Sequence, residues 1–349
     1  MTGPGQVRSH QQVTEPPLLE TRGLTKHFRI RSSRLNPHGG AVHAVDNVSL
    51  AVPKGGITAI VGESGSGKST LTRLMARLIK PTSGELLLDG RRPAASTRRA
   101  YATHVQLVLQ DPFSSLNPVH DVRYHLARPL IVHKLAGTSL DQAIEGLLDR
   151  VSLSPAALFT GKYPHELSGG QRQRVAIARA LAVQPRLLLA DEPVSMLDVS
   201  IRLGVLNLLA DLRDNDGLSI VYVTHDIASA RYLADVIAVM YAGQLVESGP
   251  AQTLTDEPSH PYTELLLSAA PDPARTRVTV NLRGKGQVPN LVAPPPGCRF
   301  HPRCPHAMSI CAEKAPMPFE ISPGHLSACW LHASGLDESQ RAPRARKEA

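Results

Sequence analysis

Aromatic residues are scarce in this chain: one Trp, seven Tyr and five Phe make up 4% of its 349 residues. Hydrophobic residues nevertheless reach 42%, so a core can form, and aliphatic side chains must fill it. The chain also lacks an apolar run of about 18 residues, which argues against a membrane-spanning helix. Residues 1–17 are polar and contain proline, without the apolar stretch of a signal peptide, so we expect a cytoplasmic protein.

Cysteine is absent from every position before Cys298. The chain has four cysteines, and all of them lie in one C-terminal stretch: Cys298, Cys304, Cys311 and Cys329. In a cytoplasmic chain such clustering indicates a metal or cluster site before it indicates disulfides. The spacing matches neither the ferredoxin patterns nor a C-x₂-C zinc pattern. The residues alone therefore leave three alternatives open, which are an iron–sulfur cluster, a structural zinc ion, and free or disulfide-bonded thiols.

The chain carries a formal net charge of +8, but the basic residues are not gathered on one segment. They are spread over the first 40 residues and over a second group at Arg91, Arg92, Arg98 and Arg99. We interpret them as solvated surface that attracts anions in general, and we expect no nucleic-acid partner.

Short apolar strands alternate with amphipathic helices along the middle of the chain. Expected strands cover 56–61, 104–109, 186–190 and 218–223, and expected helices cover 68–79, 171–183 and 199–213. This alternation predicts an α/β fold with a parallel sheet. Residues 18–28 and 41–52 read as a β-rich start, and 111–165 as a helix-rich insert.

The composition divides the chain into a large domain and a small C-terminal segment. We expect disorder at 1–17 and 333–349, one domain over 18–270 with a helical subdomain at about 111–170, and a cysteine segment at 298–332. Residues 271–297 are rich in Pro, Gly and Arg and are predicted to form a linker. No internal repeat is visible, so the chain holds one copy of the domain.

A glycine-rich loop follows the expected strand 56–61 and opens the expected helix 68–79. Its residues Gly62, Glu63, Ser64, Gly65, Ser66, Gly67, Lys68 and Ser69 fit the pattern G-x-x-x-x-G-K-[ST]. Glycines let backbone N–H groups converge on phosphate oxygens, and the helix N-terminus adds positive potential. We expect Lys68 to reach the β- and γ-phosphates of ATP, Ser69 to ligate Mg²⁺, and Thr70 to complete the nucleotide contacts. We call Gly62–Ser69 the phosphate loop.

Two carboxylates follow the apolar run 187–190. In an α/β sheet, the carboxyl end of a buried strand is where ligands bind, which places Asp191 beside the phosphate loop. We expect Asp191 to hold Mg²⁺ and Glu192 to act as the general base that polarises the attacking water.

The segment Leu167-Ser168-Gly169-Gly170-Gln171 precedes an expected helix and exposes N–H groups at its start. The order of phosphate loop, LSGGQ, acidic strand and a lone histidine resembles the ATP-binding cassette (ABC) ATPases. The resemblance implies an ABC-type P-loop core with an antiparallel β subdomain and a helical subdomain. It implies that LSGGQ contacts the ATP held by a facing cassette rather than its own.

The same resemblance assigns roles to single residues. It implies that Gln110 senses Mg²⁺ and belongs with Ser69 and Asp191 around the ion, and that His225 contacts the γ-phosphate. It implies that Phe28 stacks on adenine. The residues expected to contact the nucleotide of the facing cassette are Ser168, Gly169, Gly170, Gln171 and Asp198. Met196 stands where the family more often has Ala.

Three further segments are similar to the oligopeptide and dipeptide importer branch, which includes nickel and glutathione importers. They are residues 110–118, 163–166 and 260–263. The branch implies an ATP-hydrolysing subunit at the cytoplasmic face of the membrane that energises peptide import. The implied partners are a second ATPase subunit, two permease subunits and a substrate-binding lipoprotein.

Some branch members carry an iron–sulfur cluster at a similar motif, which implies a [4Fe–4S] cluster here, with zinc as the alternative. Competing interpretations are an importer of nickel or another solute, a soluble ABC ATPase, and an exporter subunit.

Overall fold

The structure is a computed structural model that describes residues 16–30, 40–94, 98–111, 115–137, 139–269 and 289–341. Most of the expected N-terminal tail and of the linker 271–297 lies outside the described residues. So do residues 112–114 of the segment 110–118. The described part of the C-terminal tail contains a short helix, α12 (Glu338–Arg341).

The central sheet has eight strands in the order β10-β11-β9-β8-β3-β7-β6-β5. Its middle strands β8, β3, β7, β6 and β5 run parallel, which confirms the α/β fold with a parallel core. Strands β3, β6 and β7 are buried along their whole length, because helices pack on one face of the sheet and a helix together with a second sheet packs on the other. The strands are β3 (Ile57–Val61), β5 (Val105–Val108), β6 (Leu187–Asp191), β7 (Ser219–Thr224), β8 (Val236–Tyr241), β9 (Gln244–Pro250), β10 (Phe319–Ser322) and β11 (His325–Ser327).

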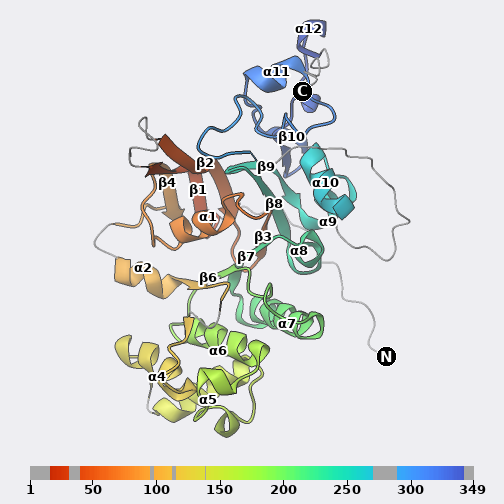
Figure 1. Cartoon of the computed structure of the whole chain (residues 1–349). Helices are drawn as coiled ribbons and strands as arrows, with labels where there is room; N and C mark the ends of the chain where they lie inside the picture. Colours follow the sequence, from red (N-terminus) through yellow and green to blue (C-terminus); the bar gives the residue numbers. More distant parts are fainter. Residues whose placement is uncertain are drawn as a thin grey trace.

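A second, antiparallel sheet of three strands packs against the first, as Figure 1 shows. Its order is β2-β1-β4, with β1 (Leu19–Ile30), β2 (Gly40–Val52) and β4 (Ser83–Leu88). Its inner face shares one apolar cluster with helix α1 (Lys68–Met75) and with the central strands, including Val45, Leu71 and Val223. The expected antiparallel β subdomain is thereby confirmed.

The helices of the insert gather at one end of the molecule, at the bottom of Figure 1. There α4 (Val122–Val132), α5 (Leu140–Arg150) and α6 (Gly169–Leu181) pack around Leu126, Leu148 and Val175. The expected helical subdomain is thereby confirmed. The other helices are α2 (Arg98–His104), α7 (Val199–Asp216), α8 (Ile227–Leu233), α9 (Ala251–Asp256), α10 (Pro261–Ala269) and α11 (Ser309–Glu313).

Several element boundaries differ from those expected, most of all the end of helix α1. Helix α1 ends at Met75 rather than near Ile79, because Arg77 takes a left-handed backbone with φ of 55° that no helix continues. His104 belongs to helix α2, so strand β5 begins at Val105.

The C-terminal segment extends the central sheet. Strand β11 pairs antiparallel with β9, and β10 pairs with β11, so the last two strands form the outer edge of that sheet. Figure 1 shows this segment at the end of the molecule opposite the helical insert. Beneath it, the buried His325 Nε2 lies 2.7 Å from Glu247 Oε1 on β9.

None of the helices in the described parts of the chain combines the length and apolar character needed to span a membrane.

Candidate nucleotide site

The phosphate loop connects β3 to α1 at the carboxyl end of the parallel sheet. A Cβ atom on Gly67 would lie 2.1 Å from the Ala44 carbonyl oxygen, and one on Gly62 would lie 2.1 Å from that of Met240. Gly67 also has φ of 102°, a backbone conformation that favours glycine. The loop therefore needs glycine at both positions to lie this close to its neighbours.

Lys68 is 4% exposed and directs its ammonium back over the loop. Its Nζ donates to the carbonyl oxygens of Gly62 at 2.7 Å and Glu63 at 2.9 Å. Burial lowers the pKa of Lys68, and the nearby carboxylates of Glu192 and Asp191 oppose that shift. The neighbouring Ser66 Oγ is buried without a hydrogen-bond partner. A buried ammonium and an unpartnered hydroxyl in one glycine loop fit a phosphate group.

Ser69 and Asp191 bring a hydroxyl and a carboxylate together at the end of β6. Ser69 Oγ donates to Asp191 Oδ1 at 3.0 Å. Adjacent oxygen ligands of an octahedral Mg²⁺ ion lie about 2.9 Å apart, given Mg–O distances of roughly 2.0–2.1 Å. Burial is the main cause that raises the pKa of Asp191, with the Glu192 charge adding to it and Ser69 opposing it. A bound cation would stabilise the ionised carboxylate that burial disfavours, so the pair fits Mg²⁺.

Glu192 is the point where side chains from three strand ends converge. Gln110 Nε2, after β5, donates to Glu192 Oε2 at 3.0 Å, and His225 Nδ1, after β7, lies 3.4 Å from the same oxygen. Glu192 has φ of 48°, and its N–H donates to the Val223 carbonyl. This turn at the strand end directs the carboxylate toward Gln110 and His225. The structure thus brings together the sequence-predicted groups, whose catalytic roles stay predictions.

The LSGGQ residues cap helix α6. Ser168 Oγ accepts from the Gln171 N–H at 3.2 Å, and the Ser168 N–H donates to Gln171 Oε1 at 3.0 Å. A Cβ on Gly170 would lie 2.4 Å from Ile201 Cγ2 of α7. Exposed Asp198 precedes α7 and makes no side-chain cap hydrogen bond. The exposed ends of α6 and α7 therefore lie at the surface, and contact with a facing nucleotide stays a prediction.

Phe28 lies on β1 with 41% of its surface exposed. The Lys26 ammonium stands 5.1 Å from the centre of its ring. An exposed aromatic ring is available for stacking, but adenine contact at Phe28 also stays a prediction.

Two residues that hold the phosphate loop in shape were not predicted from the sequence. Tyr262 Oη accepts from the Glu63 N–H at 2.9 Å, and Arg303 binds both Glu63 carboxylate oxygens at 2.9 and 3.0 Å. Glu63, expected to bind nucleotide, thus supports the loop through its side chain and its N–H. Tyr262 lies in segment 260–263, which the sequence had already singled out by its similarity to peptide importers. No motif around Arg303 points to its contact with Glu63.

The four thiols lie around the start of the C-terminal segment, and all are free. The Cys298 N–H donates to the Cys311 carbonyl at 2.8 Å, which joins the first and third cysteines. Burial raises the pKa of Cys298 to about 11 and of Cys304 and Cys329 to about 12. The other three thiolates add to the rise at Cys304, so all four groups are electrostatic neighbours.

Comparison with known proteins places the chain among transporter subunits. The family model described as ABC transporter matches residues 45–195, and the one described as oligopeptide/dipeptide transporter, C-terminal region matches 246–311. The oligopeptide transport ATP-binding protein AppF of Bacillus subtilis is 43% identical over 324 residues, covering 90% of this chain and 98% of the relative. A probable peptide ABC transporter ATP-binding protein of Sinorhizobium fredii is 43% identical over 322 residues, covering 90% of each chain.

Solved structures agree in fold. The CbiO1 subunit of an ABC transporter complex from Clostridium perfringens is 26% identical with a TM-score of 0.60, covering 70% of this chain and 92% of that one. A dimeric ATP-binding cassette bound to ADP and Pi after hydrolysis is 30% identical with a TM-score of 0.58, covering 67% and 98%. The matched regions contain the phosphate loop, LSGGQ and the acidic strand described above. The chain belongs to the family of ABC transporter ATP-binding proteins, in the group that carries the oligopeptide/dipeptide transporter C-terminal region.

Proposed function

We propose that this chain binds and hydrolyses ATP to drive the import of peptides through separate permease subunits. The observation that carries the proposal is the convergence of Gln110 and His225 on Glu192, beside the Ser69–Asp191 pair. The names of the relatives, which are peptide transport ATP-binding proteins, supply the substrate class.

The chemistry follows from where each group lies. The phosphate loop and Lys68 would hold the triphosphate, and Ser69, Asp191 and Gln110 would hold Mg²⁺, which would neutralise charge on the β- and γ-phosphates. Glu192 accepts a proton from the attacking water, and His225 donates to the γ-phosphate while it orients that water. Gln110 Nε2 donates to Glu192 Oε2, and His225 Nδ1 lies 3.4 Å from the same oxygen, so both side chains are placed to orient the base.

A second ATPase subunit completes the site in this proposal. Ser168, Gly169, Gly170, Gln171 and Asp198 lie at helix N-termini whose N–H groups attract phosphate. Ser168 and Asp198 are exposed, Gly169 and Gln171 are partly exposed, and Gly170 is buried against Ile201 of α7. The relative solved as a dimer supports the pairing of two cassettes.

The membrane partner would dock on the helical insert. A cavity of about 390 Å³ lies between β5, α4 and α6, and its lining includes Gln106, Tyr124 and Arg179. The neighbouring face of α4 exposes Tyr124, Ile131 and Val132, which is unusual for a helix that faces only water. A permease segment at this groove would lie next to Gln110, so we place the subunit at the cytoplasmic face of the membrane. A substrate-binding lipoprotein would deliver the peptide to the permeases.

We also propose a [4Fe–4S] cluster at the cysteine segment, held by Cys298, Cys304, Cys311 and Cys329. Sulfurs around a tetrahedral zinc ion lie about 3.8 Å apart, given Zn–S distances of roughly 2.3 Å. Among the described residues, which include all four cysteines, no three sulfurs lie within 4.8 Å of one another. This spacing favours a group larger than one ion. Bound iron would stabilise the thiolates that burial disfavours.

Peptide uptake by cells tests the transport function. A chromosomal Lys68→Ala allele should reduce uptake of labelled tripeptides by more than tenfold, because the triphosphate loses its buried ammonium. Lys80→Ala, which removes an exposed lysine, should leave uptake unchanged. Normal peptide uptake with Lys68→Ala would contradict peptide import, and loss of nickel uptake instead would favour the nickel importers.

Metal analysis tests the cluster. Protein purified without oxygen should contain iron and sulfide and absorb broadly in the visible range, and Cys298→Ser should bleach it. Zinc without iron would favour the structural-metal alternative. Full alkylation of metal-free, active protein would contradict both.

A further inference from the structure

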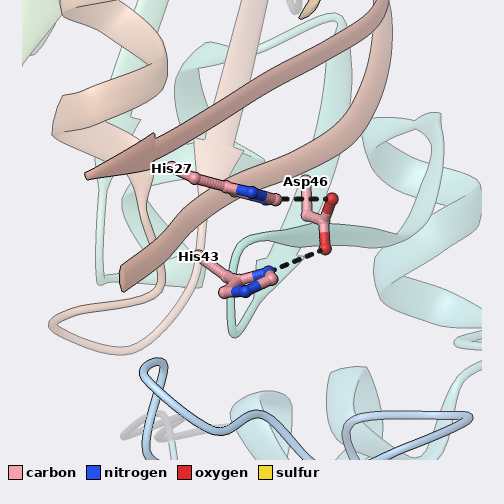
Figure 2. A group of neighbouring side chains, drawn as sticks. All are labelled: His27, His43 and Asp46. Carbon is pink, nitrogen blue, oxygen red and sulfur yellow. Dashed lines mark ion pairs between the residues drawn. The ribbon is translucent and has the colours of Figure 1, made fainter. Parts of the chain in front are cut away.

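A cluster of two histidines and one aspartate lies outside the nucleotide site, on the hairpin of β1 and β2. Figure 2 shows the His27 and His43 rings pointing from the two strands toward Asp46. Their centroids are 3.9 Å apart. His27 Nε2 lies 3.4 Å from Asp46 Oδ1, and His43 Nδ1 lies 3.6 Å from Asp46 Oδ2. The three ligand atoms lie within 4.8 Å of one another.

A β-bulge brings these three residues onto one face. His27 pairs directly with His43, but Lys26 pairs with Val45, so β2 carries one extra residue at Ala44. The extra residue reverses the alternation of faces, and Asp46 joins the side of the histidine pair. The turn between β8 and β9 holds the bulge in place, because the Asp46 N–H donates to the Gly243 carbonyl at 2.8 Å.

Hydrogen bonding does not account for the arrangement. His27 Nε2 and His43 Nδ1 are both buried atoms without a hydrogen-bond partner. Their separations of 3.4 and 3.6 Å from Asp46 oxygens are longer than normal N–H···O bonds. Two ring nitrogens therefore lie at ion-pair distance from the Asp46 carboxylate without a hydrogen bond to it.

The 3.4 Å separation between His27 Nε2 and Asp46 Oδ1 fits an edge of a metal tetrahedron, and His43 Nδ1 lies within 4.8 Å of both atoms. Nitrogen and oxygen ligands of tetrahedral zinc lie about 3.4 Å apart, given Zn–N and Zn–O distances of roughly 2.0–2.2 Å. Arg299 Nη2 donates to Asp46 Oδ2, which leaves Oδ1 for an ion and holds the carboxylate in place. The three side chains are 25–30% exposed, so a water molecule can reach a fourth position.

We propose that His27 Nε2, His43 Nδ1 and Asp46 bind a divalent transition ion of the zinc class. Two imidazoles and one carboxylate suit such an ion better than Mg²⁺, which prefers oxygen ligands. The ion would tie the hairpin that carries Phe28 to Arg299, the residue after Cys298. The Ala44 carbonyl of the same bulge lies against Gly67 of the phosphate loop, so the ion would stiffen one wall of that loop.

Zinc binding by the full chain tests the site. Equilibrium dialysis at pH 7.5 in excess Mg²⁺ would compare wild type, His43→Gln and the control His104→Gln, whose histidine is exposed on α2. All three keep the four cysteines, so zinc held by thiolates cancels in the comparison. We expect one more ion per chain in wild type and His104→Gln than in His43→Gln, or at least tenfold weaker binding at that site in His43→Gln. Equal zinc in wild type and His43→Gln would overturn the proposal.

Cobalt identifies the ligands of the extra ion. The difference spectrum between wild type and His43→Gln loaded with Co²⁺ should contain weak ligand-field bands only, because nitrogen and oxygen bind the ion. Strong sulfur-to-cobalt charge-transfer bands in that difference would place the ion at the cysteines and overturn the site. If His43→Gln does not fold, histidine modification in wild type replaces it: zinc should protect two histidines from carbethoxylation, and no protection would overturn the proposal.

Discussion

The phosphate loop and the Glu247 carboxylate beneath the C-terminal segment both hold polar groups removed from water, but these groups are partnered differently. Among the described residues, the buried Ser66 hydroxyl of the phosphate loop has no hydrogen-bond partner, and Lys68 donates to two carbonyls of its own loop. Beneath the C-terminal segment, the Glu247 carboxylate accepts from His325 and from the N–H groups of Ser259 and His260.

This difference distinguishes a ligand-binding role for the phosphate loop from a structural role for Glu247. Buried polar groups in proteins are normally hydrogen-bonded, so groups left unsaturated at a strand end mark the place of a ligand. The saturated carboxylate of Glu247 instead joins strand β9 to the segment after α9 and to β11, and holds the end of the sheet together. Substitutions in the two regions should therefore affect different quantities, activity in the first and stability in the second.

The largest effect is expected at Glu192. Glu192→Gln keeps the side-chain volume but removes the base, so ATP hydrolysis should fall by about 10²–10⁴-fold. ATP affinity should remain, because Lys68 and the phosphate loop are untouched, and the variant should accumulate as an ATP-bound dimer. Single-turnover hydrolysis and nucleotide binding by fluorescence measure the two quantities.

The matched control is Glu145→Gln, which makes the same change at an exposed position on α5. Its hydrolysis rate should equal that of wild type. Hydrolysis within a few fold of wild type in Glu192→Gln, with no partner cassette present, would remove Glu192 from the proposed role and weaken the distinction between the regions.

The sequence predicted the nucleotide region better than the C-terminal region, for physical reasons. Strands β3, β6 and β7 are buried on both faces, so each is a largely apolar run, and Gly62, Asp191 and His225 mark where the three runs end. Strands β10 and β11 have four and three residues, too few for a periodic pattern, and they form only because β9 offers an edge. Arg303 and Glu63 are 240 residues apart, and no local pattern reports such a contact.

The histidine–aspartate cluster was also invisible to sequence reasoning. Alternation along β2 places His43 and Asp46 on opposite faces, and only the bulge at Ala44 brings them together. In contrast, the acidic pair Asp191 and Glu192 was placed beside the phosphate loop because ligands bind at the carboxyl ends of strands in an α/β sheet. The resemblance to the ABC ATPases added Gln110 and His225 to the same site.

A second prediction concerns stability around Glu247, at the neighbouring His260. His260 is 1% exposed, and burial lowers its pKa to about 3, far below the ordinary value of 6.5. Between pH 3 and 6.5 the unfolded chain therefore binds a proton at His260 that the folded chain excludes, so stability falls as the pH falls through this window. At pH 5 the loss relative to neutral pH is about 2 kcal/mol.

His260→Gln should remove this acid sensitivity. Glutamine keeps an acceptor for the Tyr262 N–H, which donates to His260 Nδ1 at 3.0 Å, but it does not titrate. Urea unfolding at pH 7.5 and pH 5.0 should show that the variant loses about 2 kcal/mol less than wild type over this interval. His165→Gln, on an exposed turn, should lose as much as wild type. Identical acid losses in wild type and His260→Gln would mean that His260 is protonated in the folded protein.

The smallest effect is expected where the two regions meet, at Arg303. Its guanidinium binds both oxygens of Glu63 in the phosphate loop and lies 5.7 Å from the Tyr241 ring centroid. Arg303→Ala leaves the Glu63 carboxylate without its partner beside the triphosphate, so like charges repel and the loop loses a support. We expect ATP affinity to fall by roughly tenfold, in line with about 1–2 kcal/mol for a charge-assisted bidentate pair that is partly exposed.

Arg231→Ala removes an arginine that pairs with exposed Asp256 and serves as the control, with unchanged affinity. In the double variant Arg303→Ala with Glu63→Gln the repulsion disappears, so affinity should recover in part. Equal ATP affinity in wild type and Arg303→Ala would show that the C-terminal segment supports the sheet alone and does not act on the nucleotide site.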